Sequence, residues 1–144
     1  MGAPIMGKVL VKAHIQNLRD LFEAEKGDRK PEDVRAVEVV DALVDTGAYM
    51  LFLPKRLIKQ LGLKKFRSRR IRTAVGSGTA GVYDAVRLTI QGRECTIDVA
   101  EVPNKCPVLI GQIPLEMLDF VVDPRGQKLI GNPEHGGEHV MEMY

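Results

Sequence analysis

Residues 42–48 have the sequence Ala-Leu-Val-Asp-Thr-Gly-Ala, the most informative segment of the chain. They overlap residues 37–44, which are dense in β-branched side chains and apolar on both faces, as is typical of a strand in the middle of a domain. The strand runs directly into Asp45, so the sequence predicts a carboxylate at the end of a buried strand, in a tight turn that Gly47 permits. A buried carboxylate needs hydrogen bonds, a partner charge or a shared proton. An Asx-type turn, closed by the Asp45 side chain itself, is the competing interpretation.

Outside this stretch the pattern is also typical of a β-rich protein. Gly and Pro are scattered along the whole length and the apolar segments between them are short, which favours strands over a helical bundle. We expect strands at residues 8–15, 37–44, 86–90, 95–99, 108–110, 120–122 and 127–130. Gln91-Gly92 and residues 123–126 carry the residue types of hairpin turns. Residues 76–81 are rich in glycine and predict the mobile tip of a further hairpin.

Three short helices are expected between the strands. Asn17 is a favourable N-cap for the first, which places Leu18, Leu21 and Phe22 on one face and ends at Gly27. The second covers residues 54–61, and the third opens at Pro114.

The Asp-Thr-Gly-Ala sequence at 45–48 resembles the active-site motif of the retroviral-type (retropepsin-like) aspartic proteases. Leu-Ile-Gly at 109–111, with residues 113–118 after it, is similar to the hydrophobic–hydrophobic–glycine segment and helix that pack under the active-site loop in that family. The glycine-rich residues 75–81 lie between the two, where the family places its flap. The order and spacing of all three motifs agree over residues 37–130.

The resemblance implies a mostly β fold: a single-lobe, acid-protease-like closed β-barrel or sandwich with a flap hairpin and short helices. It also implies a set of site residues. The catalytic ones are Asp45, Thr46 and Gly47, and the substrate-binding ones are Ala48, Val75, Gly76, Ser77, Gly78, Ile110 and Gly111.

The chain carries one Asp-Thr-Gly motif, whereas two-lobed members carry two such motifs. The reaction needs two carboxylates within hydrogen-bonding reach that share a proton, because like charges so close cannot both ionise. The second carboxylate must then be Asp45 of another copy, across the axis of a symmetric homodimer. An aspartic endopeptidase of this kind activates a water between its two carboxylates and binds an extended peptide under the flap. It needs no metal, cofactor or covalent intermediate.

The sequence departs from the viral pattern at two positions. Viral members commonly have an Asp after the Asp-Thr-Gly-Ala motif and an Arg after the hydrophobic–hydrophobic–glycine segment, and the two residues pair. Here the positions hold Tyr49 and Gln112, so both partners are absent and no buried charge is left unpaired. We expect a hydrogen bond between Tyr49 and Gln112 to take the place of the ion pair.

Three regions are expected along the chain. Residues 1–36 form an N-terminal strand and helix that pack on the same domain and cover a sheet edge or add to the dimer interface. Residues 37–130 form the protease-like core, and the glycine-rich residues 131–144 form a flexible tail to which no structure is assigned.

The composition limits the kinds of partner and the cellular environment that we expect for this chain. The 144 residues carry 21 Lys and Arg against 19 Asp and Glu, a formal charge of +2, which does not predict nucleic acid or a membrane as partner. Cys95 and Cys106 are too few for a disulfide framework and indicate free thiols in a reducing environment. With no long apolar run and no signal peptide pattern, we expect a cytoplasmic protein.

Two local signals have a less specific interpretation. Residues 64–72 contain six basic residues, a density typical of nucleic-acid binding, but Phe66 is their single aromatic residue. We therefore interpret them as a solvated face or as a patch that steers acidic substrates. Glu134-His135 and Glu138-His139 could suggest a metal site, but no third ligand is evident, so no metal is expected.

Two functions remain open on these residues. The first is the homodimeric aspartic endopeptidase. The alternative is a non-catalytic peptide-binding or scaffolding dimer on the same fold.

Overall fold

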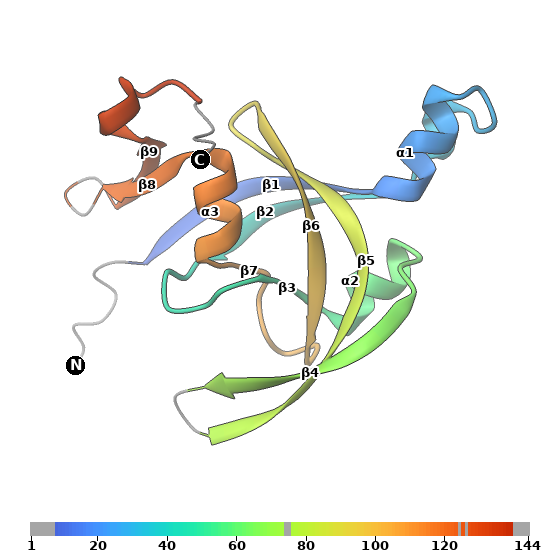
Figure 1. The fold of residues 1–144 in the computed structure, drawn as a ribbon, viewed down its shortest axis with the longest axis horizontal. Coiled ribbons are helices and arrows are strands. Elements are labelled where there is room, and N and C mark those ends of the chain that lie inside the picture. Colours follow the sequence, from blue (N-terminus) through green and yellow to red (C-terminus); the bar gives the residue numbers. More distant parts are fainter. Residues whose placement is uncertain (1–7, 74–75, 124, 126, 140–144) are drawn as a thin grey trace, which may run out of the picture.

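The computed structural model describes residues 8–73, 76–123, 125 and 127–139 (Figure 1). Its elements, in chain order, are β1 (Val9–Asn17), α1 (Leu18–Glu25), the 3₁₀ helix η1 (Pro31–Asp33), β2 (Ala36–Val44), β3 (Leu51–Pro54), α2 (Lys55–Gln60), β4 (Lys65–Thr73), β5 (Gly76–Ile90), β6 (Arg93–Val102), β7 (Leu109–Ile110), α3 (Gln112–Leu118), β8 (Phe120–Asp123), β9 (Lys128–Gly131) and the 3₁₀ helix η2 (Pro133–His135). The expected mostly β fold is confirmed. None of the helices in these residues is long and apolar enough to cross a membrane.

Six strands close into a barrel. The sheet order is β1-β2-β7-β3-β6-β5-β4, and β5 pairs with β1 as well, so β1 joins the two sides of the sheet. β8 and β9 form a separate two-stranded sheet. The expected closed barrel is therefore confirmed.

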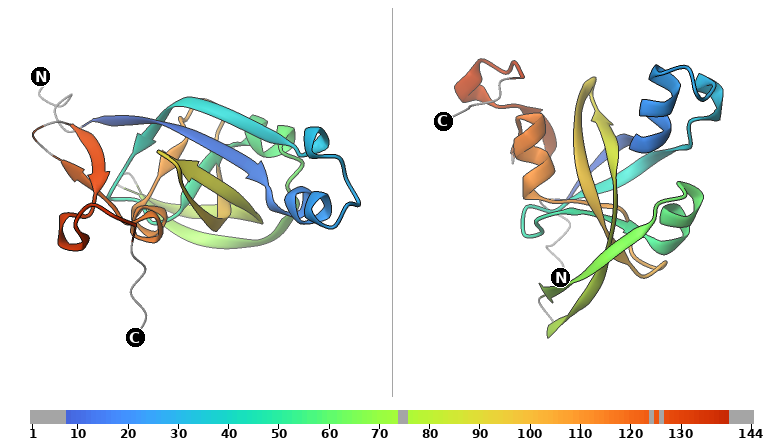
Figure 2. Two further views of the ribbon diagram at one scale, coloured as in Figure 1. Left: turned by 90° about the horizontal axis from the view of Figure 1, so that it is seen from above. Right: turned by 45° about the vertical axis from the view of Figure 1, so that its right-hand side comes forward.

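The long strand β5 contributes to two parts of the fold, the barrel and a ribbon with β4. Its second half pairs with β1 from Val86 to Thr89 and with β6 from Val86 to Ile90, inside the barrel. Its first half, residues 76–81, pairs with β4 alone among the described strands. β4 and residues 76–81 therefore form a two-stranded ribbon, here called the β4–β5 arm, which projects from the barrel at the bottom of Figure 1 and again in Figure 2.

The arm corrects one expectation. Residues 76–81 were expected to form the tip of a hairpin, but they are strand residues: Gly76 pairs with Thr73 and Gly81 with Ser68. Glycine can adopt the extended backbone of a strand, although it weakens the strand because it has no side chain to pack.

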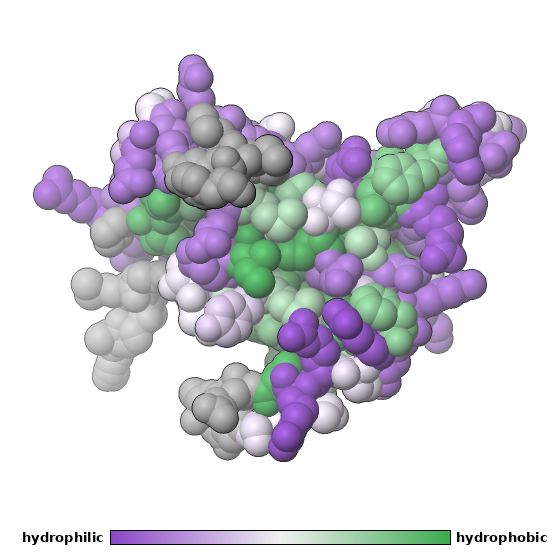
Figure 3. Space-filling model, in the orientation of Figure 1, coloured by the Kyte–Doolittle hydropathy of each residue, from purple (hydrophilic) through white to green (hydrophobic). Residues whose placement is uncertain are grey.

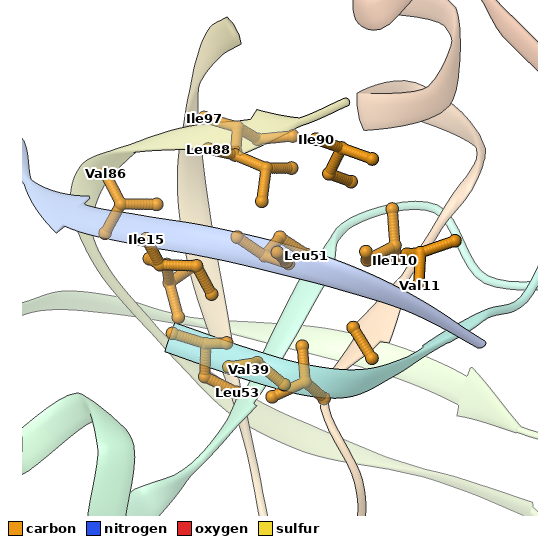
Figure 4. Close-up of a cluster of buried hydrophobic side chains, with 14 of the residues drawn as sticks. Val11, Ile15, Val39, Leu51, Leu53, Val86, Leu88, Ile90, Ile97 and Ile110 are labelled. Atoms are coloured by element: carbon orange, nitrogen blue, oxygen red, sulfur yellow. The ribbon is translucent and has the colours of Figure 1, made fainter. Parts of the chain in front are cut away.

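The core lies inside the barrel and follows the period of two in the strands. In β1, alternate residues from Val9 to Ile15 are buried, and they meet side chains from the other barrel strands (Figure 4). Ile15, Leu51 and Leu88 are each 0% exposed. Burial of one such side chain contributes about 1.5–3 kcal/mol.

The expectation that residues 37–44 are covered on both faces is wrong. Val40 is 71% exposed, while Val37, Val39, Ala42 and Val44 are buried. The reason is geometric: β2 lies between β1 and β7 in a barrel wall, so only its inward side meets the core.

The first helix is confirmed with its caps. The Asn17 side chain accepts a hydrogen bond from the backbone N–H of Asp20 at 3.0 Å, and its Nδ2 donates to the Leu61 carbonyl at 2.8 Å. Gly27 follows the helix with φ of +83°. Its apolar face is not the buried one, however: Phe22 is 49% exposed, whereas Asp20 is 0% exposed and bonds Arg35.

The expected helices at 54–61 and near Pro114 are confirmed as α2 and α3, and the turn at Gln91-Gly92 joins β5 to β6 with positive φ at both residues. The tail beyond Gly131, to which no structure was assigned, carries η2. Here the Asn132 side chain accepts a hydrogen bond from the Glu134 N–H at 3.0 Å. His135 Nδ1 forms a hydrogen bond with Asp119 Oδ2 at 2.6 Å.

Candidate active site

Asp45 lies at the point where β2 leaves the barrel wall. The backbone N–H of Leu43 donates to the Val108 carbonyl at 2.8 Å, and that of Asp45 donates to the Ile110 carbonyl at 3.0 Å. The Ala48 N–H then donates to the Asp45 carbonyl at 3.0 Å and closes a turn. The backbone of Asp45 is therefore fixed to β7 on one side and to its own turn on the other.

The Asp45 side chain takes part in the same turn. Its Oδ1 accepts a hydrogen bond from the Gly47 N–H at 2.9 Å, which is the geometry of an Asx turn. Asp45 is partly exposed, and Thr46 and Gly47 are exposed. The turn thus presents one carboxylate toward solvent, with one oxygen already oriented by a backbone donor.

Gly47 lies close beside that carboxylate. Its φ is not in the left-handed region, but a Cβ at this position would lie 3.2 Å from Asp45 Oδ1. A larger residue would therefore require the Asp45 oxygen to shift by a few tenths of an ångström.

Gly111 sits directly beneath the loop of residues 45–50. Three backbone N–H groups run from this segment to the loop: Gly111 donates to the Met50 carbonyl at 2.9 Å, Gln112 to Ala48 at 2.8 Å and Ile113 to Tyr49 at 3.0 Å. A Cβ on Gly111 would lie 2.6 Å from the Met50 oxygen and 2.6 Å from the Tyr49 carbonyl carbon. Only glycine allows this approach.

The expected hydrogen bond between Tyr49 and Gln112 is absent. Gln112 Nε2 instead donates to Glu116 Oε1 at 3.0 Å, one turn along α3, and the Tyr49 residue is 73% exposed. Backbone hydrogen bonds from residues 111–113 therefore hold the base of the loop, at the place where the viral pattern has an ion pair. Tyr49 and Ile113, which is 44% exposed, leave apolar surface beside the Asp45 turn.

The predicted site residues of the arm lie apart from the loop in sequence but on the same side of the molecule. In Figures 1 and 2, the far end of the arm and residues 45–50 are found at the same end of the barrel. Ser77 and Gly78 are exposed, and Gly76 pairs with Thr73 at the far end of the ribbon. Val75 lies outside the described residues.

A family model described as "gag-polyprotein putative aspartyl protease" matches residues 36–117. The chain belongs to the retropepsin-like aspartic protease family. The matched residues contain β2, the Asp45 turn, the arm and nearly all of α3. The search of curated proteins found no match for this chain.

Membership gives the site its chemical class. The closed barrel corresponds to a single lobe of the acid-protease fold. Aspartic proteases use carboxylates to hydrolyse peptide bonds. In this protease the structure brings together Asp45, Thr46, Gly47, Ala48, Ile110 and Gly111 around one turn. Among the described residues it shows no hydrogen bond from the arm to that turn.

The root of the arm carries a polar cluster that sequence reasoning missed. The Tyr83 hydroxyl donates to Glu101 Oε1 at 2.5 Å, and Lys55 Nζ lies 3.7 Å from Glu101 Oε2. The hydrogen bond to Glu101, followed by burial, raises the pKa of Tyr83 to about 12. The cluster joins β5, β6 and α2 where the arm leaves the barrel; no spacing in the sequence links these three residues.

One surface hollow of about 490 Å³ lies elsewhere in the protease. It is lined by residues of β1, β2, β5, β9 and the turn at Gln91, among them His14 and Glu38, which form a hydrogen bond at 2.8 Å. None of the predicted site residues lines it.

Proposed function

We propose that the protein is a homodimeric aspartic endopeptidase whose active centre is made of two Asp45 carboxylates, one from each subunit. The observation that carries this proposal is the Asp45 turn: one partly exposed carboxylate per chain, at a strand end fixed by backbone hydrogen bonds to β7. A single carboxylate cannot act as both proton acceptor and proton donor to a peptide, so the centre requires a second copy.

The surface around the turn supports an isologous contact. Thr46 and Gly47 are exposed, and the exposed side chains of Tyr49 and Ile113 flank them. In a two-fold dimer each of these residues meets the same region of its partner. Burial of the apolar surface that these two side chains leave exposed in each subunit would favour association.

The mechanism follows from two carboxylates that share one proton. The ionised Asp45 accepts a proton from a water held between the pair, and the water oxygen attacks the peptide carbonyl carbon. The protonated Asp45 donates to the carbonyl oxygen. Proton transfer to the amide nitrogen then lets the carbon–nitrogen bond break. Because the two groups titrate together, the pH profile belongs to the pair and not to either residue.

The arm is the proposed flap. Ser77 and Gly78 are exposed, and a Cβ on Gly78 would have no atom within 4 Å. Packing within one chain therefore does not require glycine at position 78. A peptide backbone that passes close to residues 76–78 would require it.

The test is cleavage of a diverse peptide library, read by mass spectrometry, with the wild-type protein and Asp45→Asn. Cleavage by the wild type that is absent from the variant, with an unchanged sedimentation coefficient, is the expected result. Equal cleavage by both proteins would contradict the proposal.

The alternative is a non-catalytic peptide-binding dimer. One observation favours it: Asp45 Oδ1 already accepts the Gly47 N–H, as in a purely structural Asx turn. Tight binding of a statine-type inhibitor without any turnover of the library would support this alternative.

A further inference from the structure

β4 has a free edge. In the described part of the chain it pairs only with β5, and it is the last strand in the sheet order. Its outer backbone N–H and C=O groups have no partner strand there. Such an edge is a template for another extended chain unless something blocks it.

The side chains along this edge are basic and exposed. Lys65, Arg67, Arg69 and Arg70 are all exposed, and within the described residues none of them forms an ion pair. Successive residues of a strand point to opposite faces, so both faces of the ribbon carry positive charge. Figure 3 shows strongly hydrophilic side chains over the arm.

The charge is concentrated there rather than spread over the molecule. Six of the 21 Lys and Arg residues lie in residues 64–72, and residues 64–81 contain no Asp or Glu. The rest of the chain therefore holds 15 basic and 19 acidic residues. A positive arm on an otherwise negative body attracts acidic partners to the arm and repels them from the rest.

We propose that the free edge of β4 binds an extended acidic polypeptide segment, which adds to the arm as a further strand with its Asp and Glu side chains opposite the arm's Lys and Arg. The segment is part of the protein substrate, a point that rests on the proposed protease function, and it lies outside the residues that are cleaved. The edge thus acts as a second binding site that selects substrates with an acidic stretch.

A polypeptide fits this edge better than a nucleic acid does. The unpaired backbone groups of β4 can be satisfied by another strand, and cross-strand pairs of opposite charge stabilise such an addition. Sequence-independent binding of single-stranded nucleic acid relies on several aromatic side chains for base stacking. Phe66, 51% exposed, is the sole aromatic residue of β4, and its ring already faces the Arg67 guanidinium at 5.1 Å.

The first experiment measures binding without turnover. A fluorescent peptide of alternating Glu and Val is titrated with Asp45→Asn protein, beside its Gln-for-Glu counterpart and a version with N-methylated backbone on alternate residues. The acidic peptide is expected to bind about tenfold more tightly than the Gln peptide, an advantage that shrinks as salt rises from about 50 mM to about 300 mM. N-methylation on the edge-facing residues is expected to abolish binding, because it removes the donors that a strand addition needs.

The variants locate the site. Arg69→Glu with Arg70→Glu is expected to weaken binding of the acidic peptide at least about tenfold. Arg69→Gln with Arg70→Gln, which leaves the edge polar, is expected to have a smaller effect in the same direction. The matched control is Lys26→Glu with Lys30→Glu, which makes the same change in net charge at exposed positions near α1, at the other end of the molecule, and is expected to leave binding unchanged.

The outcomes separate this site from the protease activity. Binding that depends on Arg69 and Arg70 but occurs without turnover of any peptide by the wild type would support the site and contradict the proposed function. Efficient cleavage of neutral and acidic substrates alike, with no effect of the arginine variants, would overturn the site and leave the protease standing. Equal loss in the control variant, or tighter arginine-dependent binding of a single-stranded RNA of the same length, would also overturn it.

Discussion

Gly111 packs so closely against the loop of residues 45–50 that a side chain would not fit between them. Its N–H donates to the Met50 carbonyl at 2.9 Å, and a Cβ at position 111 would lie 2.6 Å from that oxygen. The hydrophobic–hydrophobic–glycine segment is therefore a platform on which the loop rests through backbone hydrogen bonds. The loop that carries the Asp45 carboxylate therefore rests on a residue outside that loop.

Gly111→Ala should destabilise the protein and displace the loop. The added methyl group meets backbone atoms that cannot move separately, so we expect a loss of about 1–3 kcal/mol in the free energy of unfolding, measured by urea denaturation. Gly78→Ala is the matched control, since a Cβ there meets open space, and it should stay within about 0.5 kcal/mol of wild type. Equal stability of the two variants would contradict the platform.

Removal of the Arg35 side chain should lower the free energy of unfolding, because it takes a hydrogen-bonded partner from the buried Asp20 carboxylate. Asp20 is 0% exposed and accepts hydrogen bonds from Arg35 Nε at 2.8 Å, from its Nη2 at 3.0 Å and from its backbone N–H at 3.0 Å. Arg29 Nη2 also lies 3.3 Å from Asp20 Oδ1 and remains in the variant, so Arg35→Met should cost about 2 kcal/mol. Arg19→Met, which removes a pair to Asp84 at 3.4 Å with the Arg side chain 60% exposed, should cost no more than about 1 kcal/mol. Similar unfolding midpoints for the two variants would contradict this reading.

The same pair should make stability depend on acid pH. The hydrogen bond from the Arg35 side chain lowers the pKa of Asp20 in the folded protein. Because the folded pKa is depressed, its contribution is present above the pKa of an unfolded Asp, about 3.9, and is lost as the pH falls through the folded value. The stability gap between wild type and Arg35→Met should be full at neutral pH and shrink as the pH falls below the unfolded pKa of about 3.9. A gap that stays constant over this range would show that the pair is not its source.

Tyr83 should report on the root of the arm. Its hydrogen bond to Glu101 raises its pKa to about 12. In Glu101→Gln the anionic acceptor is gone, so an ultraviolet titration should show this tyrosine ionising closer to 10, the ordinary value. Glu94→Gln, an exposed change on the same strand β6, is the control and should leave the titration as in wild type.

Dimerisation should depend on the apolar surface beside the Asp45 turn. Ile113→Glu changes a residue that is 44% exposed in the single chain, so folding should be retained while association weakens at least about tenfold in sedimentation equilibrium. Phe22→Glu, at a residue 49% exposed on α1, is the matched control and should leave association unchanged. Equal behaviour of both variants would place the interface elsewhere.

Local patterns predicted much of this fold. The alternation of Val86, Leu88 and Ile90, the cap at Asn17 and the glycines after α1 and α2 act over a few residues, and the structure retains them. The Asp45 turn and the Leu109–Gly111 segment could be found together because both have a fixed local form that the family shares.

What the sequence did not predict depends on contacts between distant segments. The period of two places Val40 on the same face as Glu38, but only closure of the barrel leaves that face of β2 without a covering layer. The glycines at 76–81 suggest a turn by type, but pairing with β4 makes them a strand. The pairing of buried Asp20 with Arg35 likewise joins residues with no common motif. The Gln112–Glu116 bond is an exception, because it joins residues four apart on one helix, a spacing that is visible in the sequence.

Mixing of subunits shows whether two chains share one active centre. Wild type and Asp45→Asn are combined at fixed total concentration, allowed to exchange, and assayed on a cleaved peptide. If activity requires Asp45 from both chains, an equal mixture should retain about a quarter of the wild-type rate, because only that fraction of dimers pairs two intact subunits. A rate of about half, falling in proportion to the wild-type fraction, would contradict the shared centre.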